Sequence, residues 1–208
     1  MTKILLTRHG HVEGIEPERF RGRAELALTE RGLAEAQALA RRIATGWKPV
    51  EVYTSALQRC VVTGASIARA CGIGAAPLPG LMDIDYGQWQ MRTHDEVKAE
   101  APEAYRQWKT MPQSMRFPGG ESLQDLVART ADVLRLVLER HAGETVVLVG
   151  HDSVNRALLL QLLDAPLSAY GRLAQDPATL NEVDIEDGAV RILRVNDTRH
   201  LDRNCHRP

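Results

Sequence analysis

Short apolar runs alternate with longer amphipathic stretches along this chain. Three runs, at residues 4–6, 51–54 and 145–149, have the pattern of strands buried in a sheet. The last run is nearly all β-branched, which is typical of a strand covered on both faces. Four stretches have the apolar spacing of helices, and they cover residues 30–44, 57–71, 122–141 and 154–163. Because strands that alternate with helices form βαβ units, the pattern predicts a mainly parallel sheet.

A turn signal near the C-terminus adds an antiparallel element to this sheet. Asp187-Gly188 lies between two strand-like runs, at residues 181–186 and 189–195, and such a dipeptide favours a hairpin. We therefore expect a three-layer α/β/α sandwich with a mainly parallel central sheet and an antiparallel edge strand. The free edge of the hairpin offers a surface through which a homodimer could form.

Residues 77–120 interrupt the alternation of strands and helices. This segment holds Pro, Gly, Trp and Tyr without a sustained period, so we predict an irregular flap that covers the substrate. The polar residues from about 197 to 208 are expected to form a loosely ordered tail. Since no linker or internal repeat divides the chain, residues 1–208 are predicted to fold as a single domain.

Composition and charge narrow the class of protein. The chain has 208 residues, 44% of them hydrophobic, which suits one globular α/β domain. A formal net charge of -1 argues against nucleic acid or an anionic membrane as a main partner. Cys60, Cys71 and Cys205 are an odd number without metal-ligand spacing, and the first residues show no signal-peptide pattern. We therefore expect a cytoplasmic protein in a reducing environment.

Residues that carry chemistry follow the ends of the predicted strands. Arg8 and His9 come directly after the first strand, His151 follows the third, and Arg59 lies just inside the helix after the second. Because the carboxyl ends of parallel strands meet at one edge of a sheet, these four side chains are predicted to converge. Guanidinium groups and helix N-termini bind phosphate oxygens, and histidine is a nucleophile or proton carrier near neutral pH. The pattern indicates a site for phosphoryl chemistry.

Six short motifs in a fixed order extend this pattern from the first strand to the last long helix. One such motif would carry little weight, whereas six in order are specific. They are LTRHG (6–10), LTERG (28–32), SALQRC (55–60), DIDYGQW (83–89), FPGGES (117–122) and VGHDSVNRAL (149–158). Together they resemble the motifs of the histidine phosphatase (phosphoglycerate mutase-like) superfamily, in its phosphatase-type branch.

The resemblance implies a mechanism that needs no metal or other cofactor. His9 would attack phosphorus and form a phosphohistidine, for which its ring must be neutral. Arg8, Arg59 and His151 would hold the phosphate oxygens as charge redistributes. Asp83 would protonate the leaving oxygen and then deprotonate the attacking water. The implied activity is hydrolysis of a phosphomonoester of a small metabolite.

Several positions depart from the common family pattern near the phosphate. Val12 and Ile15 lack the hydroxyl and amide that relatives commonly carry there. We expect Arg21, which stands where many relatives have glutamine, to supply part of the missing contact. Asp152 and Ser153 replace two glycines. Their carboxylate and hydroxyl would lie at the mouth of the pocket and could select a substrate hydroxyl or amine.

The proposed acid also departs from the pattern. Asp83 stands where the family carries glutamate, and its side chain is one methylene shorter. Asp85 or Glu13 could therefore share its role.

Three other functions remain open from the sequence. A cofactor-dependent phosphoglycerate mutase shares the resemblance, although such mutases typically carry a longer insertion ahead of the GES turn, where this chain has only residues 105–117 before Pro118. His9 and His11, with His151 and Asp152, could instead hold a metal ion in a metal-dependent hydrolase. The lost amide and the shorter acid would also suit a non-catalytic phosphate-binding protein.

Overall fold

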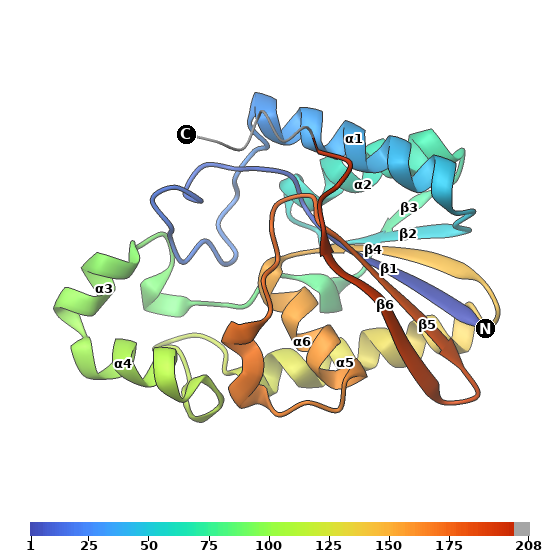
Figure 1. Cartoon of the computed structure of the whole chain (residues 1–208). Helices are drawn as coiled ribbons and strands as arrows, with labels where there is room; N and C mark the ends of the chain where they lie inside the picture. The colour runs from blue at the N-terminus through green and yellow to red at the C-terminus, as the bar shows by residue number, and fades with distance from the viewer. Residues whose placement is uncertain (202–208) are drawn as a thin grey trace.

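A six-stranded sheet lies at the centre of this computed structural model, which describes residues 1–201 (Figure 1). In sheet order the strands are β3 (Ala75–Pro77), β2 (Glu51–Thr54), β4 (Thr145–Gly150), β1 (Thr2–Arg8), β5 (Leu180–Glu186) and β6 (Ala189–Asp197). Strands β1 to β4 are parallel, whereas β5 pairs antiparallel with both of its neighbours, β1 and β6. The predicted α/β architecture with an antiparallel edge is confirmed, and β3 is an additional short strand that the apolar pattern missed.

Helices cover both faces of this sheet. On one face lie α1 (Glu30–Gly46) and α2 (Gln58–Cys71), and on the other lie α5 (Leu123–Arg140) and α6 (Asp152–Leu162) (Figure 1). All four helices were predicted from their apolar spacing. Capping side chains mark the starts of α1 and α5: the Thr29 hydroxyl accepts the Gly32 N–H, and Ser122 closes a capping box. No helix within residues 1–201 is both long and apolar enough to cross a membrane.

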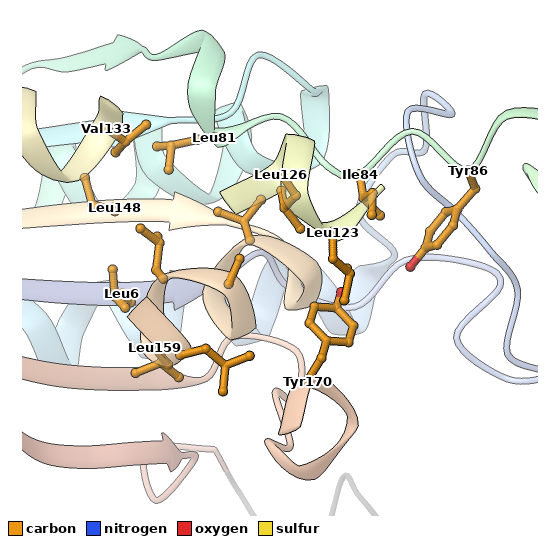
Figure 2. Close-up of a cluster of buried hydrophobic side chains, with 14 of the residues drawn as sticks. Leu6, Leu81, Ile84, Tyr86, Leu123, Leu126, Val133, Leu148, Leu159 and Tyr170 are labelled. Atoms are coloured by element: carbon orange, nitrogen blue, oxygen red, sulfur yellow. The ribbon is translucent and has the colours of Figure 1, made fainter. Parts of the chain in front are cut away.

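The central strand β1 contributes to a hydrophobic cluster on each face of the sheet. Leu5 packs with α1 and α2, while Ile4 and Leu6 pack on the side of α5 and α6, as the alternation of side chains along a strand requires. All three are fully buried. Figure 2 shows the cluster of the α5–α6 face, in which Tyr86 and Tyr170 lie away from Leu6. The strand ends are therefore held by packing on both faces.

Residues 77–120 are more regular than predicted. They contain α3 (His94–Glu100), α4 (Pro102–Thr110), η1 (Pro79–Leu81), η2 (Gly87–Trp89) and η3 (Pro112–Ser114), the last three being 3₁₀ turns. Thr93 and Glu96 form a capping box that starts α3, and Pro102 stands in the first turn of α4. The segment is thus partly helical, and α3 and α4 lie beyond the carboxyl ends of the parallel strands (Figure 1).

The C-terminal hairpin forms as predicted but extends further. Asp187 and Gly188 have positive φ angles of 50° and 80°, which such a tight turn requires. Strand β6 continues to Asp197, whose carboxylate pairs with Arg42 of α1 at 2.5 Å. Leu201 is buried against the α1–α2 cluster. Residues 197–201 are therefore held in place, and the rest of the predicted tail, with Cys205, lies outside the described residues.

Candidate active site

The ends of β1 and β4 bring two histidines together. In the sheet register Arg8 lies opposite Gly150, so His9 and His151 are neighbours, with ring centroids 5.2 Å apart in an edge-on arrangement. The backbone N–H of His9 donates to the backbone carbonyl oxygen of Gly150 over 3.1 Å. Both rings are buried, His9 being 1% and His151 0% exposed. The structure thus brings together the two histidines that the strand pattern singled out.

Two glycines let the end of β1 pack directly against the start of α1. A Cβ atom on Gly10 would lie 2.3 Å from the Gly32 carbonyl oxygen, and one on Gly32 would lie 2.1 Å from the His11 carbonyl oxygen. The Thr29 N–H donates to the same His11 carbonyl over 3.1 Å. Only glycine fits at positions 10 and 32, because the two backbone segments lie so close together there. The loop of residues 11–28 therefore leaves β1 and returns to α1 at one closely packed neck.

Both ring nitrogens of His9 have defined partners. Nδ1 lies 2.7 Å from the Gly10 carbonyl oxygen, so Nδ1 carries the proton. The Arg59 Nε–H donates to Nε2 over 3.2 Å, so Nε2 presents a lone pair. Burial lowers the pKa of His9 well below its usual range, and nearby positive charges, that of Arg59 first, lower it further. The ring is therefore neutral, with Nε2 as its basic nitrogen.

The Arg59 guanidinium is held from several sides. It is fully buried and donates to the carbonyl oxygens of Gly22 and Ala24, each over 2.7 Å. It also reaches Asp83 Oδ2 at 3.3 Å, in addition to the ring of His9. A planar fork of five donors can serve these acceptors at once. Arg59 therefore links the loop of residues 11–28 to both the histidine and the carboxylate.

Arg8 is oriented by a network of amides that was not among the predictions. Its Nη1 donates to the Gln175 carbonyl oxygen over 2.5 Å. The Gln175 side chain is in turn bonded to Asn155 at 3.0 Å and to Asn181 at 2.9 Å, and all three amides are buried. Asn155 lies in a recognised motif, whereas Gln175 and Asn181 lie in none. The Nε of Arg8 is buried with no partner among the described residues, so this donor remains for a ligand.

His151 lies between a hydroxyl and a carboxylate. Its Nε2 is 2.9 Å from Ser55 Oγ, and its Nδ1 is 3.5 Å from Asp83 Oδ2. Burial lowers the pKa of His151 well below its usual range, and the charge of Arg59 adds to this effect. Cys60 is buried with its Sγ 3.5 Å from the same Nε2. Ser55 begins the SALQRC motif, and its contact with His151 gives it an orienting role that the sequence did not reveal.

Asp83 is buried at the junction of this cluster and a cavity. Ser153 Oγ donates to Oδ1 over 2.5 Å, and the Ile84 N–H donates to the same oxygen over 2.9 Å. Oδ2 faces Arg59 and His151. Burial raises the pKa of Asp83, although the hydrogen bond from Ser153 and the charge of Arg59 act in the opposite direction. A carboxyl group in this environment can hold a proton at a higher pH than an exposed aspartate.

A cavity of about 470 Å³ lies next to Asp83. Arg21, Asp152 and Arg156 also line it, and Arg21 is buried with its Nη1 donating to the Gly14 carbonyl oxygen over 2.9 Å. Asp152 Oδ2 is 4.0 Å from Arg21 and 3.7 Å from Arg156. Burial alone would raise the pKa of Asp152, but the surrounding arginine charges outweigh it and hold the pKa below its usual range. Asp152 is thus an ionised carboxylate among guanidinium groups.

Two residues considered as alternatives contact other partners. His11 Nδ1 lies 3.0 Å from Thr29 Oγ1. Asp85 accepts the Gly87 N–H over 2.8 Å and pairs with Arg23 at 3.4 Å. Within residues 1–201, no three His, Cys, Asp or Glu side chains are grouped so that they could hold a metal ion. The ligand set that the metal-dependent alternative requires is therefore not assembled in this part of the chain.

Comparison with known proteins gives matches over nearly the whole chain. The sequence profile of the histidine phosphatase superfamily (branch 1) matches residues 4–198. Phosphoserine phosphatase 1 of Hydrogenobacter thermophilus is 33% identical over 201 residues, which are 97% of this chain and 95% of that protein. The metal-independent phosphoserine phosphatase of Arabidopsis thaliana is 34% identical over 203 residues, covering 97% and 84%. The probable phosphoglycerate mutase GpmB of Yersinia pestis is 31% identical over 208 residues, covering 97% and 96%.

The fold is likewise similar to solved structures. Bacillus stearothermophilus YhfR superposes with a TM-score of 0.87 at 26% identity, covering 96% of this chain and 99% of that one.

Proposed function

This chain belongs to branch 1 of the histidine phosphatase superfamily, and on that premise we propose how its residues divide the reaction among them. The enzyme is a metal-independent phosphomonoester hydrolase that acts through a phosphohistidine. We assign the phosphohistidine to His9. The observation that carries this assignment is the buried, neutral ring whose Nε2 faces Arg59 at 3.2 Å, beside His151.

In the first step the Nε2 lone pair of His9 attacks phosphorus. A P–N bond forms and the bond from phosphorus to the leaving oxygen breaks. Before substrate binds, this lone pair accepts a hydrogen bond from the Arg59 Nε–H. When substrate binds, a phosphate oxygen accepts that hydrogen bond instead, and the lone pair of His9 becomes free to attack. The unpartnered Nε of Arg8 supplies a further donor. The two guanidinium groups thereby stabilise the negative charge on the transferring group.

Asp83 supplies the proton and later removes one. It protonates the leaving oxygen in the first step, and in the second it takes a proton from the water that attacks the phosphohistidine. Its position supports both roles, because it lines the cavity and also contacts Arg59 and His151. The raised pKa of Asp83, which burial causes, favours the protonated form that the first step needs.

Phosphoserine is the first substrate to test, since two relatives are named as phosphoserine phosphatases. In this proposal Arg21 adds a contact to the phosphate end of the substrate. The ionised carboxylate of Asp152 takes a substrate ammonium or hydroxyl group at the wall of the cavity.

The organisation of the chain is proposed on similar grounds. The profile match over residues 4–198 supports a single domain over residues 1–208. Cys60 and Cys71 are free thiols, which supports a reducing cytoplasm as its location. Pairing of two copies along the edge of β6 stays a prediction.

A panel of phosphorylated metabolites tests the proposed activity. Wild type should release inorganic phosphate from at least one small phosphomonoester after exhaustive chelation, with His9→Ala as the blank. Brief mixing with ³²P-labelled substrate should leave acid-labile label on wild type and none on the variant. Label on His9→Ala, or phosphate release that chelation abolishes, would contradict the assignment.

A mutase is the second candidate, since the relative GpmB carries that name. Only residues 105–117, which include most of α4 and η3, lie between the segment that contains Trp89 and Pro118, and this short segment favours access of water to the phosphohistidine. The enzyme should convert little 3-phosphoglycerate to 2-phosphoglycerate when a trace of bisphosphoglycerate is present. Formation of 2-phosphoglycerate without free phosphate would establish the mutase instead.

A further inference from the structure

The cavity beside Asp83 is larger than phosphoserine requires. Its volume is about 470 Å³. Phosphoserine has about eleven non-hydrogen atoms, and even at a whole water molecule's share of liquid volume for each, about 30 Å³, it would fill roughly 330 Å³. Part of the lining comes from α4 and from η4 (Leu167–Arg172). These elements carry none of the residues assigned to phosphoryl transfer, and we call their side of the cavity the outer wall.

Two cations on the outer wall have no ion-pair partner within residues 1–201. They are Lys109 on α4 and Arg172 at the end of η4, and both are exposed. The other arginines on the cavity differ, because each faces a carboxylate: Arg19 lies 4.0 Å from Glu96, and Arg21 and Arg156 lie 4.0 Å and 3.7 Å from Asp152. Lys109 and Arg172 are therefore the cations of this cavity whose charge is left for a ligand.

The outer wall is held together behind these two cations. Trp108, next to Lys109 in the chain, packs on Tyr170, with ring centroids 5.6 Å apart. Tyr170 is two residues before Arg172 and is buried, with the Arg156 guanidinium 5.4 Å from its ring centroid. This aromatic contact joins α4 to η4. The backbone positions that carry both cations are thus set before a ligand arrives.

Within residues 1–201, Glu18 forms an ion pair with neither of the two cations. Glu18 also lines the cavity, and its carboxylate lies 3.6 Å from His94 Nε2. We propose that Lys109 and Arg172 form a second anion site, which binds a carboxylate or phosphate group at the end of the substrate remote from the scissile ester. This inference rests on the proposed function, because the ester bound at His9 sets the orientation of the substrate. The substrate class is then an elongated phosphomonoester with a second, terminal anionic group.

The expected effect is modest and depends on salt. A charge pair at an exposed site changes an equilibrium by about 1.5-fold to fivefold, so two cations on one wall should together give about tenfold. High ionic strength should reduce the effect, because exposed charges are screened.

A matched pair of substrates tests the second anion site. 6-Phosphogluconate ends in a carboxylate, whereas glucitol 6-phosphate has a hydroxymethyl group there and is otherwise the same. Wild type should favour 6-phosphogluconate by about tenfold in kcat/KM. This ratio should fall toward one at high salt and in the Lys109→Gln, Arg172→Gln double variant. Lys98→Gln, at an exposed lysine of α3 that does not line the cavity, should keep the ratio.

Binding provides a readout that does not need turnover. Calorimetric titration of His9→Ala with the same two compounds should show the same tenfold preference, again lost in the background of the double variant. A ratio near one in wild type, or a ratio that the double variant leaves unchanged, would overturn the second anion site. If no phosphomonoester were hydrolysed, even p-nitrophenyl phosphate, the proposed function would fail. A binding preference abolished by the double variant would then still support the anion site.

Discussion

The buried cluster at the sheet edge and the outer wall of the cavity, which are joined at Asp83, are built in opposite ways. At the sheet edge, His9, Arg59 and His151 are at most 1% exposed, and their ring and guanidinium nitrogens have close partners. On the outer wall, Lys109 and Arg172 are exposed and pair with no carboxylate in the described part of the chain. Buried, preorganised donors act strongly on charge that develops at phosphorus, whereas exposed cations act weakly. In the mechanism we propose, the sheet edge therefore determines the reaction, and the outer wall only biases which ester undergoes it.

Replacing the nucleophile should give the largest effect at the sheet edge. His9→Ala removes the nitrogen that we propose forms the P–N bond, so kcat should fall about 10⁴-fold or more, as observed for other catalytic nucleophiles. Phosphate release under saturating substrate measures this loss. The Tm should stay close to that of wild type, because within residues 1–201 the ring forms hydrogen bonds only with Arg59 and with its own neighbour, Gly10. Retained turnover would place the nucleophile elsewhere and break the contrast between the two regions.

Arg59→Lys tests whether the sheet edge depends on one guanidinium. A single ammonium group cannot serve the carbonyl oxygens of Gly22 and Ala24 together with Asp83 and His9. We expect kcat/KM to fall about 10²- to 10³-fold and the free energy of unfolding to fall by about 2–4 kcal/mol. The same exchange on the outer wall, Arg172→Lys, is the control for stability, and its denaturant midpoint should match wild type. Equal denaturant midpoints for Arg59→Lys and Arg172→Lys would show that the two guanidinium groups do not differ in their contribution to stability.

Asp83→Asn separates the proton donor from the phosphate contacts. An alkyl phosphate such as phosphoserine has a poor leaving group that needs the proton, so its kcat should fall about 10²- to 10³-fold. p-Nitrophenyl phosphate has a good leaving group and should lose about tenfold or less in the phosphoryl-transfer step, measured as the pre-steady-state release of nitrophenol. Equal losses with both esters would show that Asp83 acts on the phosphate and not on the leaving oxygen.

Ser153→Ala should give the smallest effect and concerns the pH dependence. The hydrogen bond from Ser153 lowers the pKa of Asp83, against the larger effect of burial. Because the acid must be protonated, activity on phosphoserine falls as pH rises through this pKa. Removing the hydroxyl should therefore raise the pKa and move the high-pH limb of kcat/KM upward, by less than about one unit. A limb that moves to lower pH, or one that stays in place, would contradict this placement of the donor.

The sheet edge could be predicted from the sequence because its residues follow strand ends. Buried apolar runs are readable, and the register of adjacent parallel strands then brings His9 beside His151. The outer wall could not be predicted in this way. Lys109 and Arg172 belong to segments far apart in the chain, and their placement on one wall depends on the packing of Trp108 on Tyr170. No periodicity along the chain encodes such a contact.

Local departures from the family pattern were also only partly interpretable. Val12 suggested a lost phosphate contact, but it is fully buried and pairs with Leu28 across the neck of the loop, so it holds the loop closed. Asp83 could be named from its motif, whereas the groups that change its pKa come from other segments. A sequence names a residue more readily than it describes the environment of that residue.

The neck formed by Gly10 and Gly32 has a consequence for how such an enzyme can change over generations. Residues 11–28, which carry Arg21 to the cavity, begin and end at this tightly packed neck, and Phe20 anchors the loop between them in the hydrophobic core. Mutation inside this loop can remodel one side of the cavity while the neck keeps the strand end in place, provided that the two carbonyl contacts to Arg59 persist. Selection for a new metabolite and retention of the old chemistry then act on separate stretches of the gene. The same division makes the loop a natural unit for exchange between relatives in the laboratory.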